Sequence, residues 1–330
     1  GWGRGNEKKQ LHILLCYFLI FRLLGVNIVL MKRFLSLLIL TRLIIIFFFT
    51  FWELNAQMAL PTFQAFSMTH FTFSGIFTNC GATERYGPTQ SQVNSTYTSG
   101  NSLYNAVTIN TQGIQEWTVP VTGTYKISVW GAQGGPMNGY ADDVTSRGGL
   151  GAILSGDFSL TKDWVLKIIV GQRGNESGGG GGTFVAKSDN TAFIVAGGGA
   201  AACGSCGSEL DAVLTEGSGN GGSGGCGSGG GGFSGNGSTG SFGDGGLGFT
   251  NGGTGGAGDT YSGSYVSVGG FGGGGGGSNC CTGGGGGYTG GQGNSGCNSD
   301  GGHSYNNATA NETSSVGNTL HGKVTIVFQE

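Results

Sequence analysis

The chain has 330 residues, among them 75 Gly and only 4 Pro, and its formal net charge is −3. Collagen is excluded, because its triple helix needs Gly at every third position together with abundant Pro, and the Gly runs at 178–182, 272–277 and 283–287 break any triplet. Nucleic acid is not an expected partner either, because its binding needs cations that neutralise phosphate, and no Lys or Arg lies between residues 188 and 322.

The N-terminal segment has the pattern of a secretory signal. A basic pair at residues 32–33 follows the first Met, Met31, and precedes a nearly unbroken apolar stretch at residues 34–52. Small residues such as Ala56 come next, as at a signal-peptidase site. We therefore predict a signal peptide at residues 31–56 that is cleaved near Ala56.

Two further interpretations belong to this segment. Residues 1–30 precede the first Met, and we interpret them as upstream translation rather than as a structured domain. An uncleaved signal anchor is the alternative, because the apolar stretch approaches the ~20 residues that span a membrane. Both alternatives place residues 57–330 outside the cytosol, either secreted or membrane-anchored and facing outward. The membrane is a partner only if the signal segment stays uncleaved.

From residue 57 to residue 200 the pattern is that of β-strands. Tyr125, Ile127 and Val129 alternate with more polar residues, as in a half-buried strand. No amphipathic helix pattern follows residue 57. Regularly spaced short strands with Gly turns predict an all-β sandwich or barrel, whose main part we assign to residues 57–200. The predicted strands lie at residues 70–75, 116–119, 125–130, 148–160, 163–171, 182–187, 190–199 and 321–328.

A glycine-rich segment, residues 201–318, separates these strands from the last one. Since a lone strand is not stable, we expect residues 319–330 to complete the sandwich, which makes the glycine-rich segment an insertion. Ordering Gly costs more backbone entropy than ordering any other residue. We therefore expect extended chains of polyproline-II type that hydrogen-bond to one another, because no side chain blocks their approach. A disordered spacer is the alternative that the composition leaves open.

The two longest late Gly runs, 272–277 and 283–287, are expected to be neighbouring chains of this bundle. The Cys280-Cys281 pair would form the turn between them, and Phe271 and Tyr288 would anchor the two outer ends.

Seven of the 8 Cys follow the signal segment. Disulfides are expected in an extracellular chain, although the spacing of Cys203 and Cys206 is also that of half a zinc knuckle. No second pair at the required spacing follows, so no metal ligand is predicted. Connectivity does not follow from sequence, and an odd number leaves one thiol over or pairs it between chains. The disulfide candidates are Cys80, Cys203, Cys206, Cys226, Cys280, Cys281 and Cys297.

Five Asn-X-Ser/Thr triplets are candidate glycosylation sites in a secreted chain. Chance matches are common in a sequence rich in Ser, Thr and Asn, so each triplet alone is a weak signal. The candidate acceptors are Asn94, Asn175, Asn236, Asn307 and Asn311.

Catalytic motifs are missing from the sequence. The His residues are scattered, without paired-ligand or catalytic spacing, and the only Gly-Lys pair, at residues 322–323, is followed by Val324 rather than the Ser or Thr of a phosphate loop. We predict no enzymatic activity, no catalytic residue, no metal and no cofactor.

An ordered series of motifs resembles one known family. The segments FTNCGATERYGPT (77–89), QEWTVPVTGTYKISVWGAQGG (115–135), FIVAGGG (193–199) and GKVTIVF (322–328) are similar to the glycine-rich extracellular domain of the anaplastic lymphoma kinase and leukocyte tyrosine kinase receptors. The resemblance covers roughly residues 71–328. It implies a tumour-necrosis-factor-like jelly roll with an inserted bundle of polyglycine helices, and a role in binding protein ligands outside the cell. The sequence lacks the glycine-rich loop and Lys of a kinase, so kinase activity is not carried over.

These observations predict a non-enzymatic, secreted protein that acts as a binding, adhesive or matrix scaffold. Its expected partner is an extracellular protein ligand or a second copy of the chain. The alternative is the ligand-binding ectodomain of a receptor tyrosine kinase-like protein, which holds if the chain is a fragment. Ice binding by flat polyglycine faces ranks below both, because the regular Thr array that it usually needs is absent.

Overall fold

The computed structural model divides the chain into two compact units, Gly1–His70 and Phe71–Glu330. The residues that the structure describes are 19–20, 25, 28–58, 71–137, 147–203, 210–259, 267–279, 281–296 and 298–329.

In the first unit, the helix α2 (Ile28–Met58) contains the whole predicted signal segment, residues 31–56, and begins three residues before Met31. Among the helices that the structure describes, none combines the length and apolar character that crossing a bilayer requires. Cleavage near Ala56 and the alternative of an uncleaved anchor both remain predictions.

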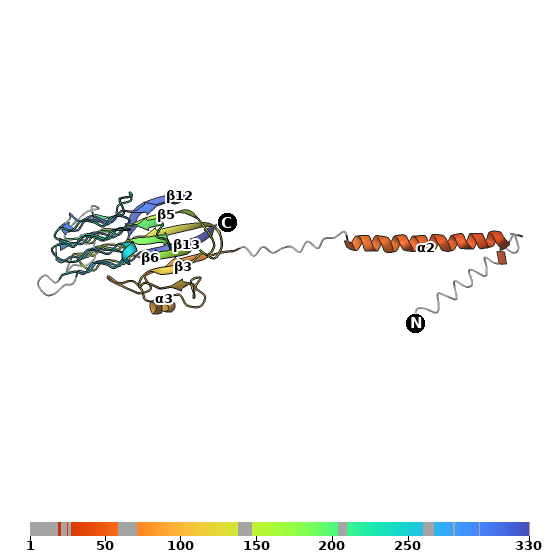
Figure 1. The fold of residues 1–330 in the computed structure, drawn as a ribbon, viewed down its shortest axis with the longest axis horizontal. Coiled ribbons are helices and arrows are strands. Elements are labelled where there is room, and N and C mark those ends of the chain that lie inside the picture. Colours follow the sequence, from red (N-terminus) through yellow and green to blue (C-terminus); the bar gives the residue numbers. More distant parts are fainter. Residues whose placement is uncertain are drawn as a thin grey trace. The chain divides into compact units, whose positions relative to one another are not determined.

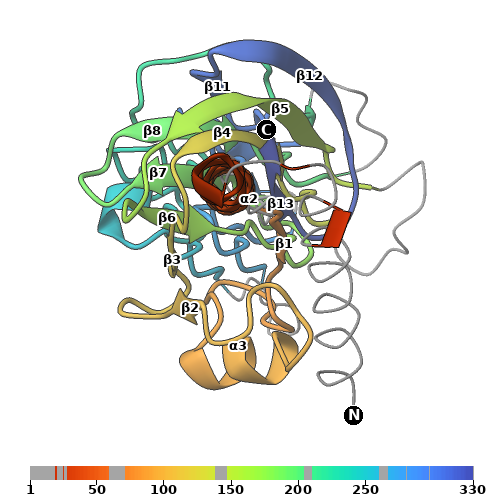
Figure 2. The same ribbon diagram turned by 90° about the vertical axis from the view of Figure 1, so that its right-hand side faces the viewer.

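The second unit contains two large antiparallel sheets (Figures 1 and 2). This confirms the all-β prediction for the folded part of the chain. The five-stranded sheet has the order β1 (Ser74–Phe77), β13 (Lys323–Gln329), β4 (Gly123–Trp130), β5 (Gly151–Leu160) and β12 (Ala310–Asn318). The six-stranded sheet has the order β11 (Tyr305–Asn306), β8 (Ala192–Ala196), β7 (Thr183–Lys187), β6 (Val165–Ile169), β3 (Gln115–Thr118) and β2 (Val107–Thr108).

The main hydrophobic core takes its residues from both sheets. Tyr125, Ile127 and Val129 of β4 are fully buried and share one face, as their alternation predicts. The rings of Trp117 and Tyr125, one from each sheet, meet edge to face with centroids 6.2 Å apart. Burying a large apolar side chain contributes roughly 1.5–3 kcal/mol, so these contacts hold the two sheets together.

Strand β13 completes the five-stranded sheet, as the sequence analysis predicts. It lies between β1 and β4, with Ile326 opposite Ile127 and Val324 opposite Val129. The chain therefore leaves the six-stranded sheet after β8, runs through the glycine-rich segment and returns to the sandwich, where β13 joins the five-stranded sheet. Both ends of that segment are held by the sandwich.

Several elements differ from the sequence-based prediction. The two-residue strands were not predicted, namely β2, β9 (Cys281–Thr282), β10 (Asn294–Ser295) and β11. The strand predicted at residues 70–75 is found at Ser74–Phe77, where Ser74 pairs with Val327 and Phe77 with Val324 of β13; His70 lies outside the described residues. A short helix, α3 (Gln90–Thr96), was not predicted, although its capping box is visible in the sequence: Thr89 caps the backbone of Gln92, whose side chain bonds back to Thr89.

Strand β12 was not predicted either. It lies within the range 201–318 that the sequence analysis assigns to the glycine-rich insertion. Its first six residues are all exposed, so it has no alternation of apolar and polar residues from which a strand could be inferred.

The role of β13 can be tested by shortening one core side chain. Ile326→Ala should lower the free energy of unfolding by about 2–5 kcal/mol, because it opens a cavity among fully buried residues. Thr325→Ala, on the opposite face of the same strand, should change it by less than about 0.5 kcal/mol. Urea unfolding of both variants measures the difference; equal stability of the two variants would contradict this placement of β13.

Candidate functional site in the glycine-rich segment

Gly runs from the glycine-rich segment and from the chain just before it form a network that we call the glycine lattice. It is defined by the runs 178–182, 197–199, 229–232, 272–277 and 283–287 and the chain segments that they contact. Figure 1 shows the teal to blue part of this network as extended traces lying side by side. The run 283–287 has hydrogen-bond partners in several different segments. Its N–H groups donate to carbonyls of Ser177, Ser228, Asp300, Gly180 and Gly231, and its carbonyls accept from Ala201, Gly275, Gly291 and Gly198, at 2.8–3.1 Å.

These hydrogen bonds repeat every three residues. Gly284 donates to Ser228, and three residues later Gly287 donates to Gly231. The run 178–182 shows the same step in the opposite direction, since Gly179 donates to Gly275 and Gly182 to Gly272. Successive residues of one chain therefore direct their backbone groups to different neighbours and return to the first neighbour at the third step.

Glycine is required here because the chains pass within backbone hydrogen-bond distance of each other. A Cβ atom placed on Gly285 would lie 2.1 Å from the carbonyl oxygen of Gly198, and one on Gly230 would lie 2.0 Å from that of Gly285. Contacts of this length with rigid backbone cannot be relieved by rotating a side chain. Even Ala is excluded at these positions.

The two late Gly runs are neighbours, as predicted. Gly275 donates to Gly284 at 2.9 Å, and the chain between the runs closes with reciprocal bonds between Ser278 and Cys281. The two predicted anchors also pack as expected. Phe271 is buried in a second hydrophobic cluster with Phe249 from the lattice and residues of β6 and β7, and Tyr288 packs against this cluster.

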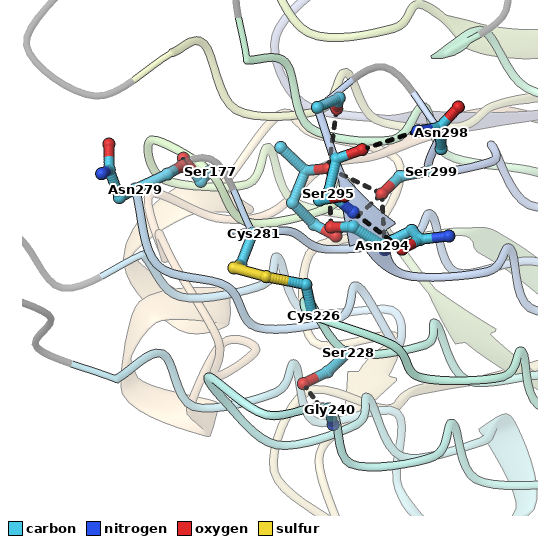
Figure 3. Close-up of a disulfide and its surroundings, with 12 residues drawn as sticks. Ser177, Cys226, Ser228, Gly240, Asn279, Cys281, Asn294, Ser295, Asn298 and Ser299 are labelled. Carbon is cyan, nitrogen blue, oxygen red and sulfur yellow. Dashed lines mark hydrogen bonds between the residues drawn. A yellow bond between two sulfur atoms is a disulfide. The ribbon is translucent and has the colours of Figure 1, made fainter.

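A disulfide fixes this turn to an earlier part of the lattice. Cys226 and Cys281 are bonded across a separation of 55 residues (Figure 3). Beside it, the hydroxyl groups of Thr282 and Ser299 lie 2.6 Å apart, and the Ser299 hydroxyl also accepts from the Asn294 backbone. Cys203 is disulfide-bonded as well. Cys206, Cys280 and Cys297 lie outside the described residues.

The prediction of Cys80 as a disulfide candidate is wrong, because its thiol is free and buried. It packs in the main core with Tyr97, where a free Cys behaves as a small apolar residue. Its thiol contacts the carbonyl of Thr78 at 3.6 Å. Burial is the main cause that raises the pKa of the Tyr97 phenol, and the nearby Cys80 raises it further. The phenol oxygen accepts a hydrogen bond from the Thr78 backbone N–H at 3.0 Å.

The five candidate glycosylation sites are all exposed, and they stay candidates. Asn94 lies on α3 and Asn311 on β12. Asn236 has a structural role, since its amide oxygen accepts from the backbone of Gly248 and the side chain of Asn251. Asn175 and Asn307 lie in connecting segments of the chain.

A loop of the sandwich holds the lattice in place. Arg85 donates from Nε to the carbonyl of Gly255 at 3.0 Å, and the Gly255 N–H donates back to the Arg85 carbonyl at 2.9 Å. The neighbouring Glu84 carbonyl accepts from the Phe271 backbone at 2.7 Å. Sequence reasoning missed this contact, because nothing in the local pattern at residues 84–86 indicates a partner about 170 residues away.

Charge in the glycine-rich part of the chain is of one sign. No Lys or Arg occurs from residue 188 to residue 322. Burial raises the pKa of the Asp300 carboxyl, an effect that nearby His303 opposes. Among the residues placed by the structure, no three His, Cys, Asp or Glu side chains gather as a metal ion would require. The acidic residues of this range are Asp189, Glu209, Asp211, Glu216, Asp244, Asp259, Asp300 and Glu312.

Similarity to known proteins covers part of the chain. No family model matches the chain. A segment of 106 residues, 31% of this chain, is 39% identical to the leukocyte tyrosine kinase receptor of Mus musculus. That segment corresponds to 11% of the receptor's length. The match supports a related receptor-type region in this chain.

The steric requirement for Gly can be tested inside the lattice. Gly285→Ala should lower the free energy of unfolding by about 3 kcal/mol or more, because the added methyl group overlaps backbone atoms. Gly225→Ala is the matched control, since its Cβ would lie 3.1 Å from the Asn294 side chain and 3.2 Å from the Gly293 carbonyl oxygen, distances that a small shift relieves. Its effect should stay within about 1 kcal/mol. If chemical denaturation finds both variants equally stable, the close-packed lattice is wrong.

The disulfide gives a second test. The double variant Cys226→Ser, Cys281→Ser should lose about 4 kcal/mol of stability, because it frees a loop of 55 residues in the unfolded chain. Ser241→Ala, at an exposed position of the same segment, should cost less than about 0.5 kcal/mol. Denaturation under non-reducing conditions compares them, and an undiminished midpoint in the double variant would contradict the constraint assigned to this bond.

Proposed function

We propose that residues 57–330 form an extracellular, non-enzymatic binding module. In this proposal a tumour-necrosis-factor-like jelly roll carries an inserted bundle of polyglycine-II-type helices. The observation that carries the proposal is the glycine lattice itself, in which backbone hydrogen bonds connect many chain segments and both ends return to one sandwich. A chain held in this way is a rigid scaffold rather than a spacer.

The bond pattern supports polyglycine-II geometry. A polyproline-II-type chain has three residues per turn and no internal hydrogen bonds, so its backbone groups point outward in three directions. The repeat of partners at Gly284 and Gly287, and again at Gly179 and Gly182, has this period. The two antiparallel sheets with a shared core are compatible with a jelly roll.

A binding role fits the surface better than a catalytic one. The Gly runs of the lattice are buried, and the exposed residues between them carry hydroxyl groups, amides and carboxylates, with no Lys or Arg from residue 188 to residue 322. Such a surface repels phosphate-bearing ligands and suits a protein partner. The expected partner is an extracellular protein ligand or a second copy of the chain.

The match to the leukocyte tyrosine kinase receptor favours a second candidate, the ligand-binding ectodomain of a receptor. The two candidates differ in the coding sequence downstream of the folded unit. A transcript that continues from Glu330 into an apolar span of ~20 residues favours the receptor ectodomain. A stop codon at that point favours a stand-alone secreted scaffold.

The extracellular location can be tested by expressing the full chain with a C-terminal tag in cultured eukaryotic cells. The tag should appear in the medium, or at the cell surface where added protease removes it. Peptide mapping without reductant should recover Cys226 and Cys281 as one linked pair. Retention inside the cell with both thiols open to alkylation would overturn the extracellular proposal.

The binding role can be tested with the secreted product labelled and applied to intact cells. Binding should saturate, and it should fall when surface proteins of the target cells are removed by trypsin. The Gly225→Ala variant should bind like the wild type, and the Gly285→Ala variant should not. Unsaturable binding, or equal binding by both variants, would contradict a folded binding module.

A further inference from the structure

Strand β12 forms the long open edge of the five-stranded sheet, and we propose that N-linked glycans on Asn307 and Asn311 cover this edge and keep the folded chain from pairing with itself. The proposal rests on the extracellular location proposed above, because glycan transfer takes place in the secretory pathway. It adds a modification site and assigns a physical task to it.

The edge is long and unpaired on its outer side. β12 is the last strand of its sheet and pairs with β5 alone, from Ala310 opposite Asp157 to Asn318 opposite Gly151. Figure 2 shows it as the outermost arrow of that sheet. Within the part of the chain that the structure describes, no backbone hydrogen bond from residues 310–318 reaches an element other than β5. Alternate N–H and C=O groups therefore face outward without a strand partner.

The other sheet edges are much shorter. β1 has four residues, and β2 and β11 have two each, against nine in β12. Nine residues of strand extend over about 30 Å. An exposed edge of this length is a template for pairing with another chain, and natural proteins protect such edges with Lys, Pro, bulges or a covering group.

Protection by side chains is weak on β12. Its sequence, ANETSSVGN, has no Lys and no Pro, and Glu312 is its only charge. A bulge interrupts the ladder where Asn311 and Glu312 together stand opposite Gly156. A second register shift falls at Gly317. The four residues between the two shifts, Thr313 to Val316, remain a regular open edge that a covering group would protect.

The two glycosylation triplets lie at this position. Asn307-Ala308-Thr309 precedes β12, and Asn311-Glu312-Thr313 includes the bulge. Both Asn side chains are exposed. Asn311 has a left-handed backbone with φ 53°, a conformation that Asn tolerates better than most residues. This conformation belongs to the bulge and places the acceptor at one end of the open edge.

The transfer reaction is compatible with the contacts of Asn311. A lipid-linked oligosaccharyl diphosphate is the co-reactant: the bond from its first sugar carbon to the diphosphate breaks, and a bond from that carbon to Asn311 Nδ2 forms. The diphosphate leaves with the electron pair, and the amide loses one proton. The Nδ2 atom keeps its second hydrogen, so its hydrogen bond to the Asp157 carboxylate, 2.5 Å long, can persist.

Other triplets provide a matched comparison. Asn94 is exposed on α3, which belongs to neither sheet. A glycan on Asn94 is therefore not attached to β12 or to a strand that pairs with it. In the triplet that begins at Asn175, the Ser177 side chain is buried and donates to the Asn279 carbonyl. Asn94→Gln therefore serves as the control for loss of a glycan in general.

The first measurement is peptide mass spectrometry on the full chain secreted from eukaryotic cells. Peptides that contain Asn307 and Asn311 should carry hexose-rich glycans, and Thr313→Ser, which keeps the triplet, should retain the glycan on Asn311. A bare Asn311 in a product whose Asn94 is glycosylated overturns this inference alone. A chain that stays inside the cell overturns the extracellular function as well, so the two failures are distinguishable.

The second measurement is molar mass by light scattering after an endoglycosidase trims each glycan to its first sugar on the folded protein. The untrimmed protein should be monomeric, and the trimmed protein should associate, with its average mass rising about twofold or more. The double variant Asn307→Gln, Asn311→Gln should associate in the same way, and Asn94→Gln should remain monomeric. A trimmed protein that stays monomeric overturns the shielding role.

A rescue variant separates edge pairing from a general loss of solubility. Ser315 is exposed in the middle of β12. Adding Ser315→Lys to the double variant should restore the monomer, because a Lys on an edge strand opposes pairing. Association that persists unchanged in this triple variant would show that the chains meet elsewhere, and would overturn the proposal.

Discussion

The backbone hydrogen bond from one Gly chain to another is the interaction on which the rest of the structure depends. Each such bond requires that two chains approach without a Cβ between them, as at Gly285 and Gly198. Ordering Gly is entropically expensive, at roughly 1–2 kcal/mol for each residue's backbone. The lattice offsets this cost by satisfying buried N–H and C=O groups that would otherwise be left without partners. The glycines therefore serve as packing material, and a side chain is excluded at the positions where two Gly chains pass this closely.

A lattice without side chains has little to define its register, so its ends and corners are held by other means. The sandwich supplies both ends of the chain, through β8 and β13. Phe271 packs in a hydrophobic cluster against β6 and β7. Arg85, which precedes Gly255 by 170 residues, donates a hydrogen bond to the Gly255 carbonyl. The Cys226–Cys281 disulfide fixes the turn between two Gly runs. The rigidity of the proposed binding surface follows from these fixed points together.

The sequence was sufficient to predict a strand wherever burial leaves a clear apolar pattern. Alternation of Tyr125, Ile127 and Val129 located β4, and the apolar strand after the Gly runs located β13. It was insufficient where tertiary contacts decide the outcome. Strand β12 is polar because it is an edge, so it lacks a periodic signal. The pairing of Cys226 with Cys281, the free thiol of Cys80 and the bond from Arg85 to Gly255 all depend on distances that the fold alone sets. The capping box at Thr89 indicates the start of α3 in the sequence, although the surrounding strand pattern favoured an interpretation without helices.

The central claim is that the glycine-rich segment is ordered by its own backbone hydrogen bonds. Hydrogen–deuterium exchange on the secreted protein tests it most directly, because each lattice N–H with a carbonyl partner should exchange slowly. Peptides covering residues 269–293 should be protected to an extent similar to peptides of β4, while the exposed turn at residues 98–101 exchanges fast. Exchange of residues 269–293 at the rate of an unstructured chain would contradict the account.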